Sequence, residues 1–240
     1  MSTRIKITGL ILWMFMLGNV SAQEFYNSVN PLTTKSNTLN YKLTGKQYYF
    51  LSTLNGTVYF NDNWVSGKLK LENGDRYDSV YIKLNTFLED LVAYNERTGA
   101  VYVVDKSIID EFEMEFEKGQ KFLFRKVVFD RAPKGEHYLN VLYDGRVKLY
   151  AWYRTLEMQT STYKDNYGLL RDSEFRAEIV YWLAFPDNSI HRVAMKRRSF
   201  LQLFPEQKRS LRRSFRKNRV YFYTPEHLVQ AARIVEQEMF

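Results

Sequence analysis

Residues 68–84 read Lys-Leu-Lys-Leu-Glu-Asn-Gly-Asp-Arg-Tyr-Asp-Ser-Val-Tyr-Ile-Lys-Leu, and this stretch decides the fold class. Before the turn at Asn73-Gly74, polar and apolar residues alternate, and a segment rich in tyrosine and β-branched residues follows it. Asn-Gly favours a tight hairpin turn because both residues tolerate a positive φ angle. The stretch therefore predicts two antiparallel strands joined by a short turn.

The same pattern continues on both sides of this hairpin. In residues 109–117, Phe112, Met114 and Phe116 alternate with glutamates, so one strand face is expected in the core and the other in solvent. Short aromatic and β-branched segments predict further strands at 47–51, 56–60, 91–94, 100–104, 121–129, 136–143, 146–153, 178–185 and 189–193, with a polar insertion at about 155–172. Because no helical pattern separates these segments, we expect an antiparallel meander that forms a barrel, a half-barrel or a sandwich.

The pattern changes after Val193. Residues 199–204 begin a helical pattern, Pro205 can open a helix that runs to Lys217, and Thr224 is expected to cap a last helix that has Pro225 at its first position. A strand-like stretch at 220–223 separates these helices. We therefore expect a mainly β protein with two to three C-terminal helices. Its predicted regions are an extended arm or loop at 23–46, with one edge strand as an option, a β-rich domain at 47–194 and a basic helical region at 195–240.

The first 22 residues have the layout of a secretory signal peptide. Arg4 and Lys6 precede an apolar run at 7–17, and small and polar residues lead to Ala22. The apolar run is shorter than the ~20 residues that span a bilayer, so a retained anchor helix is the weaker alternative. We expect cleavage near Ala22-Gln23 and an exported protein, located in the periplasm or at the cell surface and beyond.

Composition excludes several classes of function. The chain has 240 residues, of which 45% are hydrophobic and 16% aromatic, so it can bury a core and is not expected to be disordered. It has no cysteine, which excludes disulfides, thiolate metal sites and a cysteine nucleophile. Its histidines, His137, His191 and His227, are not at metal-ligand spacing. Phosphate-loop, dinucleotide-binding and nucleophile-elbow motifs are missing as well. We expect no catalytic residues, no metal and no cofactor, with an envelope hydrolase that uses distant carboxylates as the least favoured alternative.

The strongest functional signal is the distribution of charge. The net charge is +8, yet residues 192–219 contain eleven basic residues and one acid, so the rest of the chain sums to −2. On a helical wheel, Leu211 and Phe215 share one stripe, and the cations border it or lie opposite. The predicted anion-binding residues are Lys208, Arg209, Arg212, Arg213, Arg216 and Lys217.

Such a face suits phosphates and carboxylates, because arginine presents a bidentate donor fork. For an exported chain, the expected partners are anionic lipid, lipopolysaccharide or an acidic envelope protein, and not nucleic acid. We therefore expect non-catalytic binding or assembly at the envelope. A solvated basic helix that pairs with acidic strands such as residues 111–117 is the alternative without a partner.

A second hypothesis for the function rests on the aromatic content. The chain has 18 tyrosines, 17 phenylalanines and four tryptophans, many of them alternating within predicted strands. In a barrel or half-barrel these side chains can line a pocket for lipid or another hydrophobic ligand. A carrier of such a ligand is therefore the alternative to binding through the basic helix.

Three segments carry a family resemblance: residues 64–77, which contain Trp64-Val-Ser-Gly67 and Asn73-Gly74, residues 138–150 around Asp144-Gly145, and residues 199–208 around Pro205. Together they resemble a group of uncharacterised exported proteins from Bacteroidetes-type bacteria with a β-rich body and a charged helical tail. The resemblance covers most of residues 48–223 and implies export and architecture. Its motifs are structural, so it implies no site residue and no activity.

Overall fold

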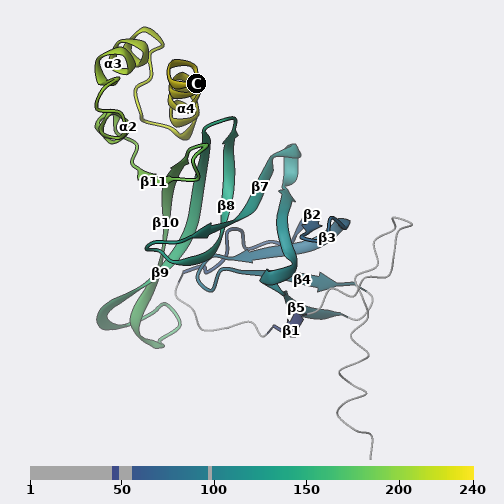
Figure 1. Ribbon diagram of the computed structural model, residues 1–240. Helices are drawn as coiled ribbons and strands as arrows, with labels where there is room; N and C mark the ends of the chain where they lie inside the picture. The colour runs from purple at the N-terminus through teal and green to yellow at the C-terminus, as the bar shows by residue number, and fades with distance from the viewer. Residues whose placement is uncertain (1–44, 49–55, 97–98) are drawn as a thin grey trace, which may run out of the picture.

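The computed structural model describes residues 45–48, 56–96 and 99–240, and the predicted signal peptide and nearly all of the predicted arm at 23–46 lie outside these residues. The described residues form one antiparallel sheet of eleven strands with three α-helices at one end (Figure 1). The strands are β1 (Gly45–Gln47), β2 (Val65–Leu71), β3 (Arg76–Asn85), β4 (Asp90–Asn95), β5 (Ala100–Val104), β6 (Ile109–Glu115), β7 (Lys121–Phe129), β8 (Gly135–Asp144), β9 (Lys148–Lys164), β10 (Leu170–Ala184) and β11 (Ile190–Val193). The helices are α2 (Arg197–Leu203), α3 (Lys208–Lys217) and α4 (Pro225–Met239).

The strand order confirms the predicted mainly β, antiparallel fold and shows that its meander consists of two parts. The order is β1-β5-β4-β3-β2-β6-β7-β8-β9-β10-β11, so β6 pairs with β2 and not with β5. Two meanders, β2–β5 and β6–β11, therefore join along the β2–β6 pair. Within the described residues β1 and β11 are the two edges and do not pair with each other, so the sheet is open.

A short link between β5 and β6 requires the sheet to curl. Four strand spacings separate these strands, which is roughly 19 Å in a flat sheet. The chain from Val104 to Ile109 spans at most about 17 Å when extended, and part of it is the one-turn 3-10 helix Lys106–Ile108. The curled strands enclose a core in which buried side chains of β5 and β6 share one cluster, including Tyr102, Val104 and Ile109.

Aromatic side chains fill the interior of the curl. The Phe60 ring centroid lies 5.0 Å from that of Phe122, 5.2 Å from that of Phe124 and 4.7 Å from that of Tyr153, each in an edge-to-face arrangement. This geometry is favoured by the ring quadrupoles and adds to the burial of apolar area. Residues 56–60, predicted as a strand, form only one isolated bridge between Tyr59 and Asn85, and Phe60 contributes its ring to the core.

The turn between β3 and β4 forms hydrogen bonds to strands β8 and β9, and these contacts of Glu89 are called the clasp below. Glu89 Oε1 accepts a hydrogen bond from Trp152 Nε1 on β9, and Glu89 Oε2 accepts one from His137 Nδ1 on β8, both at 2.6 Å. The neighbouring Thr86 accepts the backbone N–H of Thr155 at 2.9 Å. Glu89 has a φ angle of +58°, a left-handed conformation that non-glycine residues rarely adopt. Its contacts hold this conformation in place.

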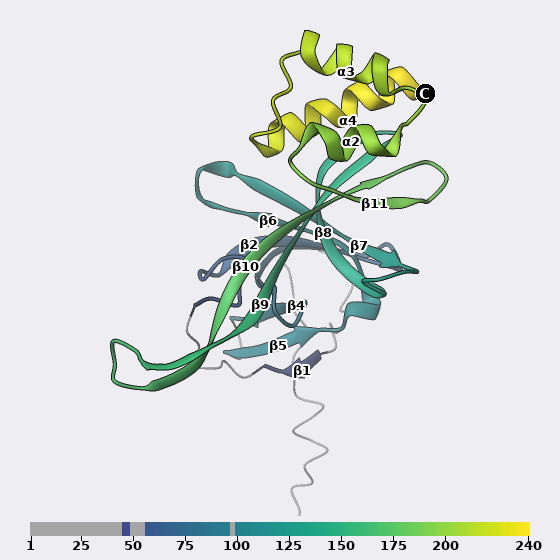
Figure 2. The ribbon, with the colours of Figure 1, turned by 90° about the vertical axis from the view of Figure 1, so that its left-hand side faces the viewer.

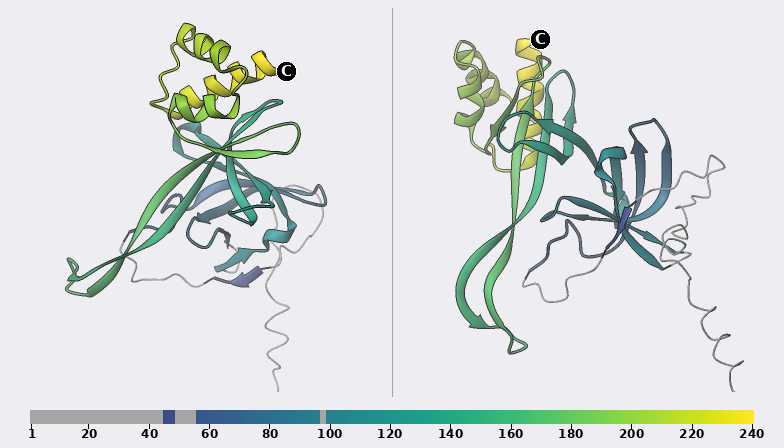
Figure 3. Two further views of the ribbon diagram at one scale, coloured as in Figure 1. Left: turned by 60° about the vertical axis from the view of Figure 1, so that its left-hand side comes forward. Right: turned by 60° about the horizontal axis from the view of Figure 1, so that its bottom comes forward.

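The predicted polar insertion at 155–172 is in fact β structure. The strands β9 and β10 continue through it as a two-stranded ribbon that projects from the sheet, away from the helices (Figures 2 and 3). Polar Gln, Thr and Ser side chains suit a ribbon whose faces are largely in solvent, which is why the pattern resembles a loop in the sequence.

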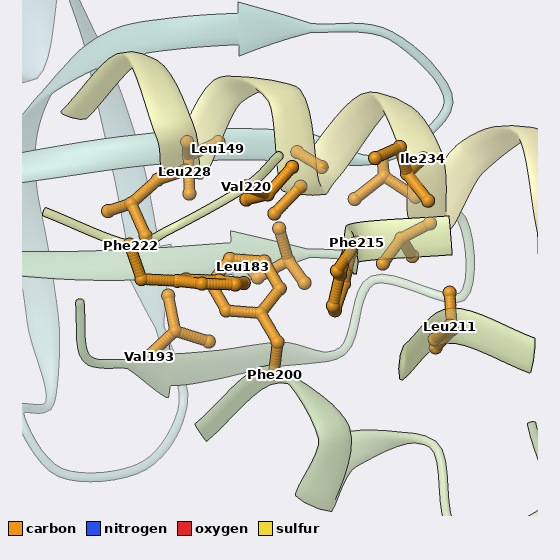
Figure 4. Packing of buried hydrophobic residues seen from close by; sticks show 14 of the residues in the cluster. Leu149, Leu183, Val193, Phe200, Leu211, Phe215, Val220, Phe222, Leu228 and Ile234 are labelled. Atoms are coloured by element: carbon orange, nitrogen blue, oxygen red, sulfur yellow. The ribbon is translucent and has the colours of Figure 1, made fainter. Parts of the chain in front are cut away.

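The three helices form a cap on the end of the sheet where β9 begins and β10 ends. A separate apolar core joins the two: Leu149 and Leu183 from the sheet meet Phe200, Phe215 and Leu228 from the helices (Figure 4). Helix α2 ends before Pro205, in line with the extended bias of a residue that precedes proline. Pro205 lies between α2 and α3 and does not open a helix, and residues 220–223 form no strand.

We predict that Glu89→Ala lowers the free energy of unfolding by about 2–4 kcal/mol, because two largely buried donors lose their acceptor. Alanine keeps the cost of a positive φ angle, so the change isolates the side-chain contacts. Urea denaturation measures the effect, with Glu96→Ala in the exposed turn after β4 as the control. Equal stability of the two variants would show that the clasp contributes nothing.

Candidate anion-binding face on a basic helix

The structure places the six predicted cations on one exposed surface of α3. Lys208, Arg209, Arg212, Arg213, Arg216 and Lys217 are all exposed, and they are called the basic face below. On the other side of the helix, Leu211 and Phe215 are completely buried in the core of the cap. The predicted division between an apolar stripe and an outward charged surface is therefore present in the fold.

The basic face lacks acidic partners within the described part of the chain. No ion pair or hydrogen bond joins its six side chains to any described residue. A carboxylate that does contact α3 is Glu238 of α4, whose Oε1 accepts a hydrogen bond from Ser214 at 2.6 Å and whose other oxygen accepts one from Ser210. That carboxylate thus binds serines and leaves the arginines to solvent.

Cations on the sheet behave differently. Arg125 pairs with Glu111 at 3.2 Å and with Asp144 at 3.0 Å, and the hydrogen bond from Arg125 holds the pKa of Asp144 below its usual range. Lys121 lies 3.0 Å from Glu113. The expected alternative, in which the basic helix pairs with the acidic strand at 111–117, is therefore wrong for these glutamates, since neighbouring strands supply their cations.

Most of the charges of α3 oppose its own helical structure, although Arg216 and Lys217 in the last turn suit the helix dipole. Six pairs of cations are spaced three or four residues apart, and each like-charge pair destabilises a helix by roughly 0.2–0.5 kcal/mol. Lys208 and Arg209 also occupy the first turn, where the positive end of the helix dipole disfavours cations, and no acid is present there. Burial of Leu211 and Phe215 offsets these costs. If this helix needed only to be soluble, we would expect acidic residues among the basic ones, so that more of its charges were paired.

Arg219 extends the basic segment at a position that usually requires glycine. After the last turn of α3, the Val220 N–H donates to the Phe215 carbonyl at 2.9 Å and the Arg219 N–H donates to the Arg216 carbonyl at 3.1 Å. This pair of bonds is the Schellman motif, in which the residue at the position of Arg219 is left-handed and most often glycine. Arg219 has a φ angle of +54° and is exposed. The sequence places Arg219 in the basic segment, but only the backbone shows its strain.

Two exposed tyrosines follow the basic face directly and are not predicted from the sequence, where residues 220–223 resemble a strand. Tyr221 and Tyr223 are 53% and 79% exposed, and their rings are nearly parallel with centroids 6.1 Å apart. Phe222 between them is buried and has a φ angle of +64°. This backbone turn directs two aromatic rings outward beside the end of α3.

The remaining candidates from the sequence are separate from this face. His137 lies on β8 and is hydrogen-bonded to Glu89, whereas His191 on β11 is exposed and His227 in the first turn of α4 is half-buried. Among the residues that the structure describes, no three His, Asp or Glu side chains are arranged to hold a metal ion. None of the described helices is long and apolar enough to cross a membrane.

The fold and this face define an open, curled antiparallel sheet with a helical cap that bears unpaired cations. Comparisons of the chain with protein-family models, with curated proteins and with solved structures find no match.

We predict that Arg219→Gly stabilises the protein by about 1 kcal/mol, because glycine adopts the left-handed conformation without a Cβ clash. For a chain of this size the melting temperature should rise by roughly 2–4 °C. The matched control is Arg213→Gly in the middle of α3, which should lower stability by about as much. If both variants were destabilised, the backbone at Arg219 would not be under strain.

Proposed function

We propose that this chain is an exported envelope protein that binds, without catalysis, to an anionic component of the envelope through the basic face of α3. The observation that carries the proposal is the contrast in pairing. Lys121, Arg125 and Arg154 on the sheet have carboxylate partners, while the six cations of α3 have none among the described residues and most of them destabilise the helix that bears them. Because these unpaired charges lower the stability of the protein, we expect them to serve a function, and binding of anions is the one that suits them.

The shared chemistry of the ligand is a surface of phosphate or carboxylate groups. Anionic lipid, lipopolysaccharide and an acidic envelope protein all present such groups, and we favour anionic lipid. Tyr221 and Tyr223 support this choice, because exposed tyrosine rings with an apolar body and a polar tip suit the boundary between headgroups and acyl chains.

A carrier of lipid in the curved sheet has less support. That function needs space inside the curl, and the rings of Phe60, Phe122, Phe124 and Tyr153 occupy the interior. This packing favours recognition at the surface of the cap.

The test is binding of the protein to vesicles that contain phosphatidylglycerol, compared with vesicles of phosphatidylcholine alone. We predict binding only to the anionic vesicles, with an affinity that falls as salt is added. Replacing Arg209, Arg213 and Arg216 together by glutamine should weaken binding roughly 100-fold, since each cation near an anionic surface contributes about 1 kcal/mol.

The matched control removes the same charge elsewhere, by glutamine at Lys68, Arg76 and Arg176, three exposed cations of the sheet. These substitutions should leave vesicle binding nearly unchanged. Binding that is equally weakened by both triple variants would reflect net charge only and would contradict a defined site on α3. Parallel assays with lipopolysaccharide and with an acidic polypeptide identify the source of the anion.

A further inference from the structure

The ribbon formed by β9 and β10 ends in an exposed apolar tip. Its base is attached to the sheet by the contact of Thr86 with Thr155 and by the edge-to-face packing of Phe87 on Phe175, whose ring centroids are 5.1 Å apart. The arm tip, residues 164–170, lies far beyond this base (Figures 2 and 3). It carries three large exposed side chains: Tyr167 at 90%, Leu169 at 48% and Leu170 at 69%.

The arm tip is held in one conformation by its own hydrogen bonds. Asp165 Oδ1 accepts the backbone N–H groups of Tyr167 and Leu169, each at 2.9 Å, and the Gly168 N–H donates to the Asp165 carbonyl at 2.9 Å. Gly168 has a φ angle of +78°, which an L-residue rarely adopts. Because the turn is already formed, little conformational entropy remains to be lost when Tyr167 is bound. A preorganised turn that exposes an aromatic ring is typical of a protein contact site.

A pocket of about 340 Å³ lies at the opposite end of the sheet, near the cap. It is formed by the end of β7, the start of β9 and the turn from β10 to β11. Apolar side chains that include Val127, Val128, Phe185 and Ile190 line it together with two cationic residues, Arg146 and Lys148. This lining suits an aromatic ring that has a polar tip, which is what Tyr167 provides.

The arm tip and the pocket cannot meet within one chain. The strands β9 and β10 run continuously from the pocket to the tip, and the 16 residue steps of β9 correspond to roughly 50 Å. A convex apolar tip at one end and a concave pocket of apolar and cationic residues at the other form the two halves of a heterologous contact, which joins copies into a ring or an open filament.

We propose that this protein self-associates head to tail, with the arm tip of one copy, centred on Tyr167, inserted into the Val128 pocket of the next copy. Apolar contact dominates this interface, since Lys164 beside Asp165 leaves the tip with little net charge. Association is therefore insensitive to salt. Self-association therefore differs from the binding of anions by α3, which weakens as salt is added. The proposed self-association does not depend on the proposed function.

The experiment is sedimentation velocity of the exported protein over a wide range of concentration, at low and at high salt. The expected result is a mass that increases with concentration beyond that of a dimer and is the same at both salt levels. Tyr167→Ser, which alters the tip, and Val128→Glu, which alters the pocket, should each give monomers. Both residues are largely exposed, at 90% and 61%, so the fold is expected to tolerate the changes, and circular dichroism checks this.

Mixing the two variants gives the decisive result. The first retains an intact pocket and the second an intact tip, so an equimolar mixture should form a one-to-one dimer and nothing larger. Tyr81→Ser, a change of another exposed tyrosine that lies on β3, should assemble as the unmodified protein does. The proposal is overturned if the unmodified protein is monomeric at every concentration, if Tyr167→Ser still assembles, or if the mixture stays monomeric. Binding of the tip to neutral vesicles by a monomeric protein would assign it to a bilayer instead.

Discussion

The link of a few residues between β5 and β6 is the constraint on which the rest of the structure depends. It cannot bridge four strand spacings of a flat sheet, so the sheet must curl, and the aromatic side chains around Phe60 pack inside the curl. The turn between β3 and β4 then reaches β8 and β9, where Glu89 accepts hydrogen bonds from His137 and Trp152. This clasp fixes the second meander against the first and leaves its far end available as a platform for the helices.

In the helical cap, the residues that stabilise α3 are different from the residues that carry its charge. Leu211 and Phe215 anchor the helix in a core shared with the ends of β9 and β10, so the outward surface need not contribute to folding. That surface contains like charges at helical spacing, cations in the first turn and an arginine in a left-handed position. Each of these features is unfavourable to the monomer, and each places a cation on the same segment of the chain. Their coincidence is what distinguishes this helix from an ordinary solvated one.

Much of this arrangement can be predicted from local sequence patterns. The hairpin at 68–84, the alternating strand at 109–117, the start of the last helix at Thr224 and Pro225 and the buried stripe of α3 all follow from residues a few positions apart. The pairing of β6 with β2 joins segments that local patterns do not connect, so the register of the two meanders is not predictable in this way. The ribbon at 155–172 is misjudged because its solvated faces lack an apolar period. Similarly, Glu89 and His137 are 48 residues apart, and only the fold brings them together.

The β2–β6 pair also affects the order in which the sheet folds and the way it responds to a pulling force. On each side of it, nearly every strand pairs with its neighbour in sequence, so each meander can form from contacts that close only short loops, a rapid class of folding event. Joining the meanders is the slower step, because it must bring together segments about 40 residues apart, as the pair Lys70 and Glu111 illustrates. A pull applied between the cap and the first strands would load this row of hydrogen bonds together with the Glu89 clasp. We therefore expect the β2–β6 pair to form late in folding and to separate only when the clasp opens as well.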